Sequence, residues 1–541
     1  MIRYIVSALL MLGSLSCFAQ NFREEFDKFR NQIKKEYNDF RQEANQRYAD
    51  YLSEAWERYK AMEPIERPKE ATPLPPLIYV EPVLPQVSPL VTPDVEPITP
   101  PLVQPEIQPT VPPELEPIII PKENQAEEPV EEQVKPAVRP DGQPIIKVTP
   151  IIVPLLAVEP QPVPVEPIKE KIEPNPEYFT FSFLGNETDV RLPKENKIVL
   201  KNLSGKTLGS AWEQLSNGDM DNLLYDCLKI REENNLCDWA YLLMLEALAK
   251  AFYGDTNEAT MLMAWLYCQS GYQMRLASAS DQLVMLYGSK HLIYDSPSYV
   301  QDGATLYPFR NKSSELNISK AKYPGEKQMS LLIDKEPVTG NSLSKERNII
   351  SKKYPEINML SQVKNPLIDF FNTYPTSALD GNLMTRWAMY ANTPLSIETK
   401  EKLYPKFKQE LQGMSELEST QRILNWVQTG LEYKFDDEVW GGDRAFFAEE
   451  TLYYPYCDCE DRAILFSRLV RDLLGLDVAL VYYPGHLAAA VNFNEKVSGD
   501  AMVVNGKDFI VCDPTFIGAP VGVQMPNMDY NRAQAIVLKK N

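Results

Sequence analysis

The sequence predicts an α+β protein in which buried helices precede antiparallel strands. Residues 463–474 are apolar on nearly every face and end at Gly475, which predicts a buried helix with a glycine C-cap. Pro484-Gly485 and Asn505-Gly506 then separate apolar runs of strand length, which predicts two hairpins. A similar helix-then-strand pattern stands earlier in the chain, over residues 205–310.

The first residues, 1–19, predict a signal peptide. Arg3 supplies the positive end, residues 5–15 the apolar core, and Cys17-Phe18-Ala19 a small-residue cleavage site. We therefore expect an exported protein of the periplasm or cell envelope. Lipidation at Cys17 is the alternative, although Ser14-Leu15-Ser16 fits the usual lipobox poorly. No other apolar run reaches the length of a transmembrane helix.

Residues 20–63 predict one charged amphipathic helix, of the coiled-coil type, with an eleven-residue repeat. The residues that recur at this period are Phe26, Tyr37, Tyr48 and Tyr59, then Phe29, Phe40 and Tyr51, and then Ile33, Ala44 and Ala55. Eleven residues make almost three helical turns, so these rows form a stripe along the helix. Such a stripe needs a cover. Self-association, docking on an envelope partner and folding back on the protein's own body all stay open.

Residues 64–176 are dominated by proline, with Val, Ile, Leu and Glu between. Proline lacks the amide donor that helix and sheet interiors use. We therefore expect a disordered, semi-rigid spacer. Such a spacer would separate the N-terminal helix from the globular part, so that the two act at different places. Recognition of the proline-rich segment by a partner is the alternative.

The remaining chain divides into four segments. Residues 177–204 predict short strands, since Phe179, Phe181 and Phe183 alternate with polar residues, followed by Ile198 and Leu200. Helices are expected within 207–253, inside the 205–310 segment. Residues 311–395 predict a small β-rich linking domain, with strands at 330–334 and 348–351. Helices over 396–411 and 416–431 open the last domain, 396–541, whose loop 433–448 is expected to form the lip of a cleft or a plain connection.

Three residues of the last domain form a candidate catalytic set. Cys459, His486 and Asp513 follow one another as thiol, base and carboxylate, the order that a thiol nucleophile uses. The chain has only two histidines in 541 residues, which argues against a chance arrangement. Cys459 is expected in the first helical turn, where free N–H groups and the helix dipole favour the thiolate. Taken singly, each residue is more often a packing or turn residue.

The motif resembles the transglutaminase-like superfamily, a branch of the papain-like cysteine enzymes, in its bacterial Asp-Cys-Glu-Asp form. The matching residues are Thr451-Leu452, Asp458-Cys459-Glu460-Asp461, Ala463, Leu465, Arg471, Gly475, His486 and Asp513-Pro514-Thr515. The resemblance implies a helix with an N-terminal cysteine packed on an antiparallel sheet. It further implies Cys459 as nucleophile, His486 as general base and Asp513 as its orienting carboxylate.

Two points within this resemblance stay open. Cys457 stands where the family usually has glycine, which makes it a rival nucleophile, although the acidic flanks favour Cys459. The oxyanion donor is not placed by the motif. Tyr453 and Trp440 are candidates only because they are aromatic and lie upstream.

The resemblance implies acyl-thioester chemistry on peptide or glutamine amides, without a cofactor. Water as second nucleophile makes the protein a peptidase or amidase, the interpretation we favour. An amine makes it a cross-linking transglutaminase. The alternative from another class is a catalytically inactive adaptor that binds envelope partners.

Residues 205–310 predict a degenerate transglutaminase-like copy of the last domain. Ala259 and Gly271 are twelve residues apart, as are Ala463 and Gly475. In this register Asp255, Asn257, Gln282 and Phe309 stand at the places of Cys459, Asp461, His486 and Asp513. The first copy would then be a structural or substrate-binding unit. General helix-then-strand similarity is the alternative, and His291 is expected to be an ordinary core or surface residue.

Composition excludes several classes of site and partner. The net charge of −20 argues against nucleic acids and anionic membrane surfaces. Cys457 and Cys459 with one histidine do not provide four ligands at zinc spacing, so no metal site is expected. The 7 cysteines are few for 541 residues, which excludes a disulfide scaffold. A bridge from Cys457 to Cys459 or to Cys512 stays open.

Overall fold

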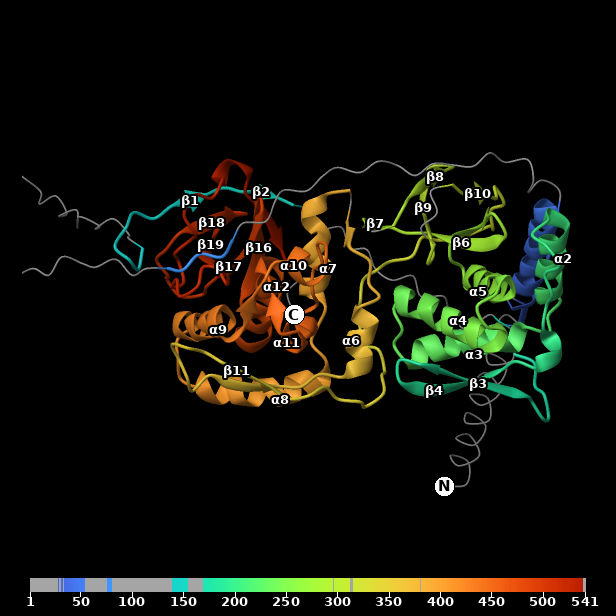
Figure 1. Cartoon of the computed structure of the whole chain (residues 1–541), viewed down its shortest axis with the longest axis horizontal. Helices are drawn as coiled ribbons and strands as arrows, with labels where there is room; N and C mark the ends of the chain where they lie inside the picture. Colours follow the sequence, from blue (N-terminus) through green and yellow to red (C-terminus); the bar gives the residue numbers. More distant parts are fainter. Residues whose placement is uncertain are drawn as a thin grey trace, which may run out of the picture.

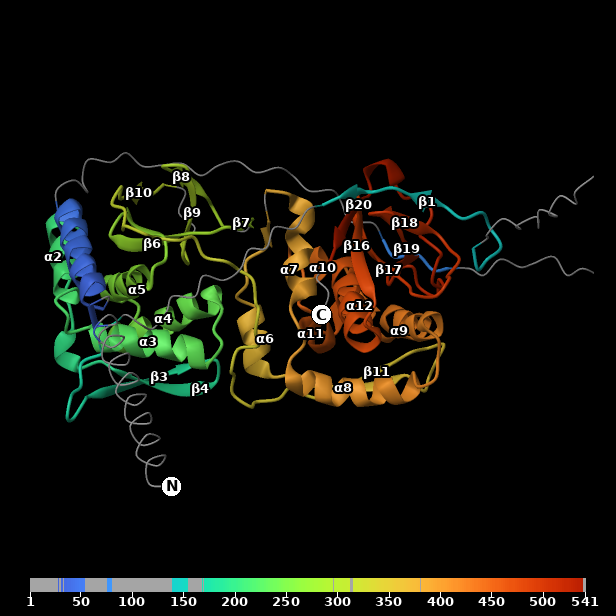
Figure 2. The ribbon, with the colours of Figure 1, turned by 180° about the vertical axis from the view of Figure 1, so that it is seen from behind.

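The chain folds into two units that lie side by side (Figure 1; Figure 2 from behind). The computed structural model describes residues 28, 31–32, 34–53, 75–79, 139–153, 168, 170–294, 296–311, 315–379 and 381–538, and all structural statements below refer to these. The predicted signal peptide, 1–19, lies outside the described residues. Helices and largely antiparallel sheets alternate in both units, in agreement with the predicted α+β class.

The first unit contains a hairpin, a group of helices and a five-stranded antiparallel sheet. Its elements are β3 (Tyr178–Phe183), β4 (Asn186–Arg191), α2 (Gly205–Leu215), α3 (Asp221–Glu233), α4 (Asp238–Tyr253), α5 (Asn257–Gln269), β5 (Met274–Ala279), β6 (Gln282–Gly288), β8 (Tyr299–Gln301), β9 (Ala304–Pro308) and β10 (Asn317–Ile318). The strand expected around residues 198–200 is absent. The Ile198 and Leu200 N–H groups donate to the side chains of Tyr253 and Glu258 instead of to a strand.

The second unit carries the candidate catalytic residues. Its elements are α8 (Ile397–Glu410), α9 (Glu416–Gly430), β14 (Glu432–Tyr433), α10 (Asp436–Val439), α11 (Ala448–Tyr453), β15 (Tyr456–Cys457), α12 (Cys459–Leu474), β16 (Asp477–Tyr483), β17 (His486–Asn492), β18 (Ala501–Val504), β19 (Lys507–Cys512) and β20 (Gln534–Val537). The predicted helices, the two hairpins and the C-cap at Gly475, whose φ is 68°, are confirmed.

The two units share one arrangement of helix and sheet. The strands of the first unit lie in the order β10-β5-β6-β9-β8, and those of the second in the order β20-β16-β17-β19-β18. All these neighbours pair antiparallel. In each unit one helix packs on the two strands that follow it in the chain: α5 on β5 and β6, and α12 on β16 and β17. This correspondence follows the register predicted from Ala259 and Ala463 and supports an internal duplication.

The segment between the units is not the β-rich domain that the sequence predicts. The described residues of 311–395 form the short strands β10, β11 (Arg347–Ile350), β12 (Asn358–Ser361) and β13 (Ser377–Ala378), the helices α6 (Asn365–Phe371) and α7 (Arg386–Asn392), and the 3-10 helix η3 (Leu383–Thr385). Residues 330–334 form no strand. Hairpin β11–β12 packs on α8 and α9, whereas β13 pairs with β7 (Leu292–Ile293) of the first unit. The segment therefore joins the two units instead of folding on its own.

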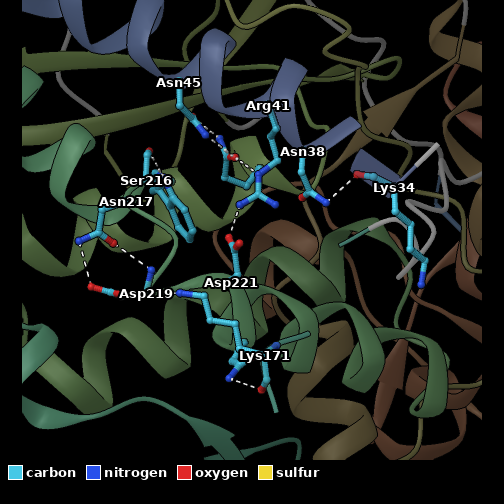
Figure 3. A network of polar contacts seen from close by, with 12 residues as sticks. Lys34, Asn38, Arg41, Asn45, Lys171, Ser216, Asn217, Asp219 and Asp221 are labelled. Atoms are coloured by element: carbon cyan, nitrogen blue, oxygen red, sulfur yellow. Dashed lines mark hydrogen bonds and ion pairs between the residues drawn. The ribbon is translucent and has the colours of Figure 1, made fainter. Parts of the chain in front are cut away.

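The N-terminal helix, residues 34–53, folds back on the first unit. Its buried face contains Tyr48, whose ring lies 4.4 Å from that of Trp212. Buried polar contacts accompany this packing (Figure 3): Arg41 bonds to Gln269 and Asp221, and Asn45 exchanges two hydrogen bonds with Gln269. The row of Tyr37 and Tyr48 is thus covered internally. Phe40 and Tyr51 of the neighbouring row stay exposed, and among the described residues of the three rows they are the ones open to the expected self-association or envelope partner, while residues 26, 29, 33, 55 and 59 lie outside the described part.

Asn45→Leu is expected to lower the free energy of unfolding by about 2 kcal/mol. Asn45 accepts from Trp212 Nε1 at 3.1 Å and pairs with Gln269, so leucine would leave buried polar groups on both partners without hydrogen bonds. Urea unfolding of the full chain measures the change. Gln46→Leu, on the exposed face of the same helix, is the control. Equal effects of the two substitutions would contradict the buried docking of the helix.

The proline-rich segment is not a free spacer where the structure describes it. Tyr79 N–H donates to Ile517 O at 2.9 Å, and Ile517 N–H to Leu77 O at 2.8 Å. Strands β1 (Lys147–Val148) and β2 (Ile151–Ile152) pair in parallel with β18 and β20, at the two ends of the sheet. Because only two residues separate β1 from β2, the sheet must curl until these ends approach each other.

This attachment corrects the expectation that the N-terminal helix and the globular part act at different places. Residues 34–53 lie on the first unit, residues 77–79 and 146–153 contact the second, and Lys171 exchanges hydrogen bonds with Asn222 of the first unit. Proline disfavours sheet interiors, and β1 and β2 are edge strands in agreement with this expectation. In the described part of the chain, no helix is both long and apolar enough to cross a bilayer.

Candidate active site

Cys459 is the first residue of α12, as predicted. The Asp461 carboxylate accepts the backbone N–H groups of Asp458, at 3.3 Å, and of Phe446, at 2.8 Å, and so fixes the start of the helix. Cys459 is buried, at 4 % exposure, but it lines a pocket of about 510 Å³ together with His486. The thiol donates a hydrogen bond to Glu460 at 3.1 Å.

His486 and Asp513 form a direct contact. His486 opens β17, Asp513 follows β19, and these two strands are neighbours in the sheet. Nε2 of His486 lies 2.9 Å from Oδ2 of Asp513. The second carboxylate oxygen accepts the N–H groups of Thr515 and Phe516, which holds it in place. Nδ1 of His486 is buried and has no hydrogen-bond partner within the described residues. The structure thus brings Cys459 and His486 to one pocket, and Asp513 contacts His486 from outside the pocket lining.

Two residues that the motif did not single out hold the Asp513 loop. The Gln428 side chain, buried on α9, donates to the carbonyls of Asp513, Phe516 and Ala519. Arg462, buried on α12, donates to the carbonyls of Gln428, Leu431 and Pro514. Arg462 did carry a signal, since a charged residue inside an apolar helix needs buried partners. Gln428 carried none, because one glutamine on an amphipathic helix is unremarkable.

The rival residues lie elsewhere. Cys457 is in β15, donates to Glu432 O at 3.7 Å and is not part of the pocket wall. Neither Trp440 nor Tyr453 lines the pocket; both rings pack on Tyr454, so neither is placed as an oxyanion donor. The six cysteines of the described residues are unpaired, so neither bridge from Cys457 is formed.

The pocket lip comes from α10 and the loop after it. Asp436, Asp437 and Glu438 of α10, together with Asp443, line the pocket, which agrees with the predicted lip at 433–448. Sets of three ligand atoms, namely Asp436 with Asp458 and Asp461, Asp436 with Asp443 and Glu460, and Cys459 with Asp458 and Glu460, each lie within 4.8 Å of one another. Within the described residues, these carboxylate oxygens lie close enough together to bind a cation. The spacing of Cys457 and Cys459 in the sequence gave no indication of them.

The charge state of the thiol differs from the sequence expectation. Burial, and then the charges of Glu460 and Asp458, raise the pKa of Cys459 well above its usual value, against the smaller effect of the Leu487 backbone N–H. The motif alone suggests a thiolate at the helix N-terminus. The raised pKa instead favours the neutral thiol in the free protein. A neutral thiol needs a base when it attacks, and His486 has the free nitrogen for that role.

Alkylation of Cys459 in the free protein is expected to be slower at pH 7 than that of a free cysteine, and to keep increasing beyond pH 9. The physical reason is the raised pKa, since only the thiolate reacts. Iodoacetamide labelling followed by peptide mass spectrometry measures the rate at each pH. Fast labelling that is constant from pH 6 upward would show a resting thiolate and contradict this assignment.

The first unit has a groove at the corresponding place. The groove holds about 530 Å³ and is lined by Asp255, Asn257, Gln282 and Phe309, the residues predicted to stand at the triad positions and at Asp461. None of these supplies a thiol or an imidazole. His291, outside this register, is buried, and burial lowers its pKa to about 3, as for a neutral core histidine. The first groove therefore lacks the groups for acyl-thioester chemistry.

Comparison with protein-family models, curated proteins and solved structures finds no match to this chain. The functional interpretation therefore rests on the residues and their geometry.

Proposed function

We propose that the protein is an exported cysteine enzyme of the transglutaminase-like type, which acts on peptide or glutamine amides through an acyl-thioester. The observation that carries this proposal is the His486–Asp513 contact of 2.9 Å beside the pocket that Cys459 lines. It leaves Nδ1 of His486 as the free proton acceptor next to a pocket that holds a thiol.

In the first half of the reaction Cys459 Sγ adds to the amide carbonyl while its proton passes to Nδ1 of His486. The imidazolium formed is stabilised by the Asp513 carboxylate, which stays ionised. His486 then returns the proton to the amide nitrogen, the C–N bond breaks, and an amine leaves. Sγ now holds the acyl group as a thioester.

In the second half we propose that water attacks the thioester, with His486 again as base. The C–S bond breaks, a carboxylic acid leaves, and the thiol recovers its proton. An amine in place of water gives a cross-linked amide, the second candidate reaction. The inactive adaptor remains the alternative from another class. It is favoured by the raised pKa of Cys459 and by the first unit, which has the same strand order without a triad.

Intact-protein mass spectrometry after mixing with a library of peptide amides tests the proposal. We expect an acyl mass increment on wild type that hydroxylamine removes and that maps to Cys459. Added labelled methylamine that appears in the product would favour cross-linking, and ¹⁸O from water would favour hydrolysis. Product profiles that are identical for wild type and Cys459→Ala would overturn the enzymatic proposal in favour of the adaptor.

A further inference from the structure

The pocket beside Cys459 is lined by two chemical kinds of side chain, which we call the apolar wall and the acidic wall. The apolar wall is formed by Leu383, Met384, Trp387, Phe435 and Leu487. The acidic wall is formed by Asp436, Asp437, Glu438, Asp443, Asp458 and Glu460. Two arginines also line the pocket, and one of them, Arg386, bonds to Asp443 at 2.6 Å. Six carboxyl groups face two guanidiniums, so the lining favours cations, although burial and the charge of Glu460 raise the pKa of Asp436 and Asp458 and oppose their ionisation in the free protein.

The acidic wall reaches the candidate nucleophile. Carboxylate oxygens of Asp458 and Glu460 lie within 4.8 Å of each other and of the Cys459 sulfur. Asp458 is 3 % exposed and Glu460 is 4 % exposed. A cation held by this pair would therefore lie directly beside the bond that Cys459 attacks.

One of these oxygens lacks a partner. Oδ1 of Asp458 is buried and accepts no hydrogen bond within the described residues, although Asp458 lines the pocket. A buried carboxylate oxygen without a donor is unfavourable by itself. Burial and the charge of Glu460 also raise the pKa of the neighbouring Asp436 to about 8, since carboxylates this close resist joint ionisation. A donor that carries positive charge would satisfy both.

We propose that this acidic wall binds a primary ammonium group at the end of an alkyl chain, so that the preferred substrate carries a lysine-type side chain next to the amide bond. The inference on substrate rests on the proposed function, whereas the ammonium site itself rests only on the pocket. Three N–H donors of an ammonium match several carboxylates at once. The apolar wall suits the methylene stem, which prefers burial.

A bound metal ion would explain the carboxylates of the pocket but not its apolar lining. Carboxylates in sets of three can hold a hard divalent cation. A metal ion makes no use of the aliphatic and aromatic wall, where Trp387 stacks on Tyr482 with ring centroids 5.6 Å apart. The combination of the two walls therefore favours an organic cation.

A bound ammonium group would also lower the pKa of the Cys459 thiol. The charges of Glu460 and Asp458 are the second and third causes that raise the pKa of Cys459, after burial. A substrate cation beside these carboxylates offsets that effect and favours the thiolate when the amide is in place. The thiol would then be activated by the substrates that carry the correct cation.

Binding of pentylammonium to the full-length Cys459→Ala protein tests the site without turnover. Saturation-transfer NMR should show saturable binding of pentylammonium and at least about tenfold weaker binding of its neutral counterpart, 1-pentanol. Glu460→Gln, introduced into the Cys459→Ala protein, should weaken the binding of pentylammonium by at least about tenfold. Asp443→Asn, at a side chain that is 39 % exposed, is a second variant with less risk to folding. Asp255→Asn is the matched control, because this side chain lies in the first unit and is 91 % exposed. It should leave the affinity for pentylammonium unchanged.

Equal binding of pentylammonium and pentanol, or no effect of both pocket variants, would overturn the proposal. Binding of Ca²⁺ without any binding of pentylammonium would overturn it in favour of a metal site. A second arm compares wild-type hydrolysis of peptide amides that contain lysine or norleucine, with at least about tenfold preference in kcat/KM expected for lysine. Binding without turnover of any peptide would refute the proposed function and leave the ammonium site standing, whereas turnover without lysine preference would refute the site alone.

Discussion

Cys459→Ala is expected to reduce amide turnover by roughly 10⁴-fold. Cys459 is the only cysteine among the described residues that lines the pocket with His486, and no other thiol is placed to form the acyl-enzyme. Its removal leaves the base and carboxylate without a nucleophile. Steady-state hydrolysis of a responsive peptide amide measures the loss, and the free energy of unfolding checks that the fold is kept.

Cys457→Ala is the matched control for this experiment. Cys457 is equally buried, two residues away, and bonds to Glu432 O instead of facing the pocket. We expect its removal to change turnover by less than about threefold, with a loss of stability of roughly 1 kcal/mol from the small cavity. If Cys457→Ala were inactive and Cys459→Ala active, the assignment of the nucleophile would be reversed.

Arg462→Met is expected to lower the free energy of unfolding by about 4 kcal/mol. Arg462 is 1 % exposed, and its guanidinium donates to Leu431 O at 2.9 Å, Gln428 O at 3.2 Å and Pro514 O at 3.4 Å. Methionine fills much of the volume but leaves three carbonyls without this donor. Since Pro514 follows Asp513, turnover should fall as well, through a loss of order at the His486–Asp513 contact.

Urea unfolding and the pH dependence of turnover separate the two effects of Arg462→Met. Arg47→Met is the control, because that side chain is 77 % exposed and pairs only with Glu43 one turn away, where a change under about 0.5 kcal/mol is expected. A stability loss at Arg462 as small as that at Arg47 would show that the three carbonyl contacts do not hold the loop.

The features of the site that the sequence predicts correctly are those that depend on a few neighbouring residues. The cysteine at a helix start, the Gly475 C-cap and the Asn505-Gly506 turn each depend on a few neighbouring residues, so the helix and both hairpins could be predicted. The shared register of the two units could also be predicted, because helix length and turn spacing correspond in the two segments. The strands predicted at 198–200 and 330–334 are wrong, because side chains accept the backbone N–H groups there, namely those of Ile198, Leu200, Ser330 and Leu332.

The direction of the pKa shift of Cys459 could not be predicted from the motif. A cysteine in a first helical turn suggests a thiolate, but burial and the carboxylates around it reverse the direction of the pKa shift. Asp436 and Asp443, more than fifteen residues upstream, reach this pocket only through the folded path of α10 and its loop.

The sequence by itself indicated the candidate residues Cys459, His486 and Asp513, the order of helices and strands around them, and the lack of a cysteine and a histidine at the corresponding places of the first unit, since these depend on residue type and short-range periodicity. Only the tertiary structure decided what covers the N-terminal helix, that proline-flanked residues pair with both ends of the sheet of the second unit, and that six carboxyl groups line the pocket beside Cys459. Those outcomes depend on contacts between residues far apart in the chain, such as Asn45 with Gln269, whose energy exists only once distant surfaces have met.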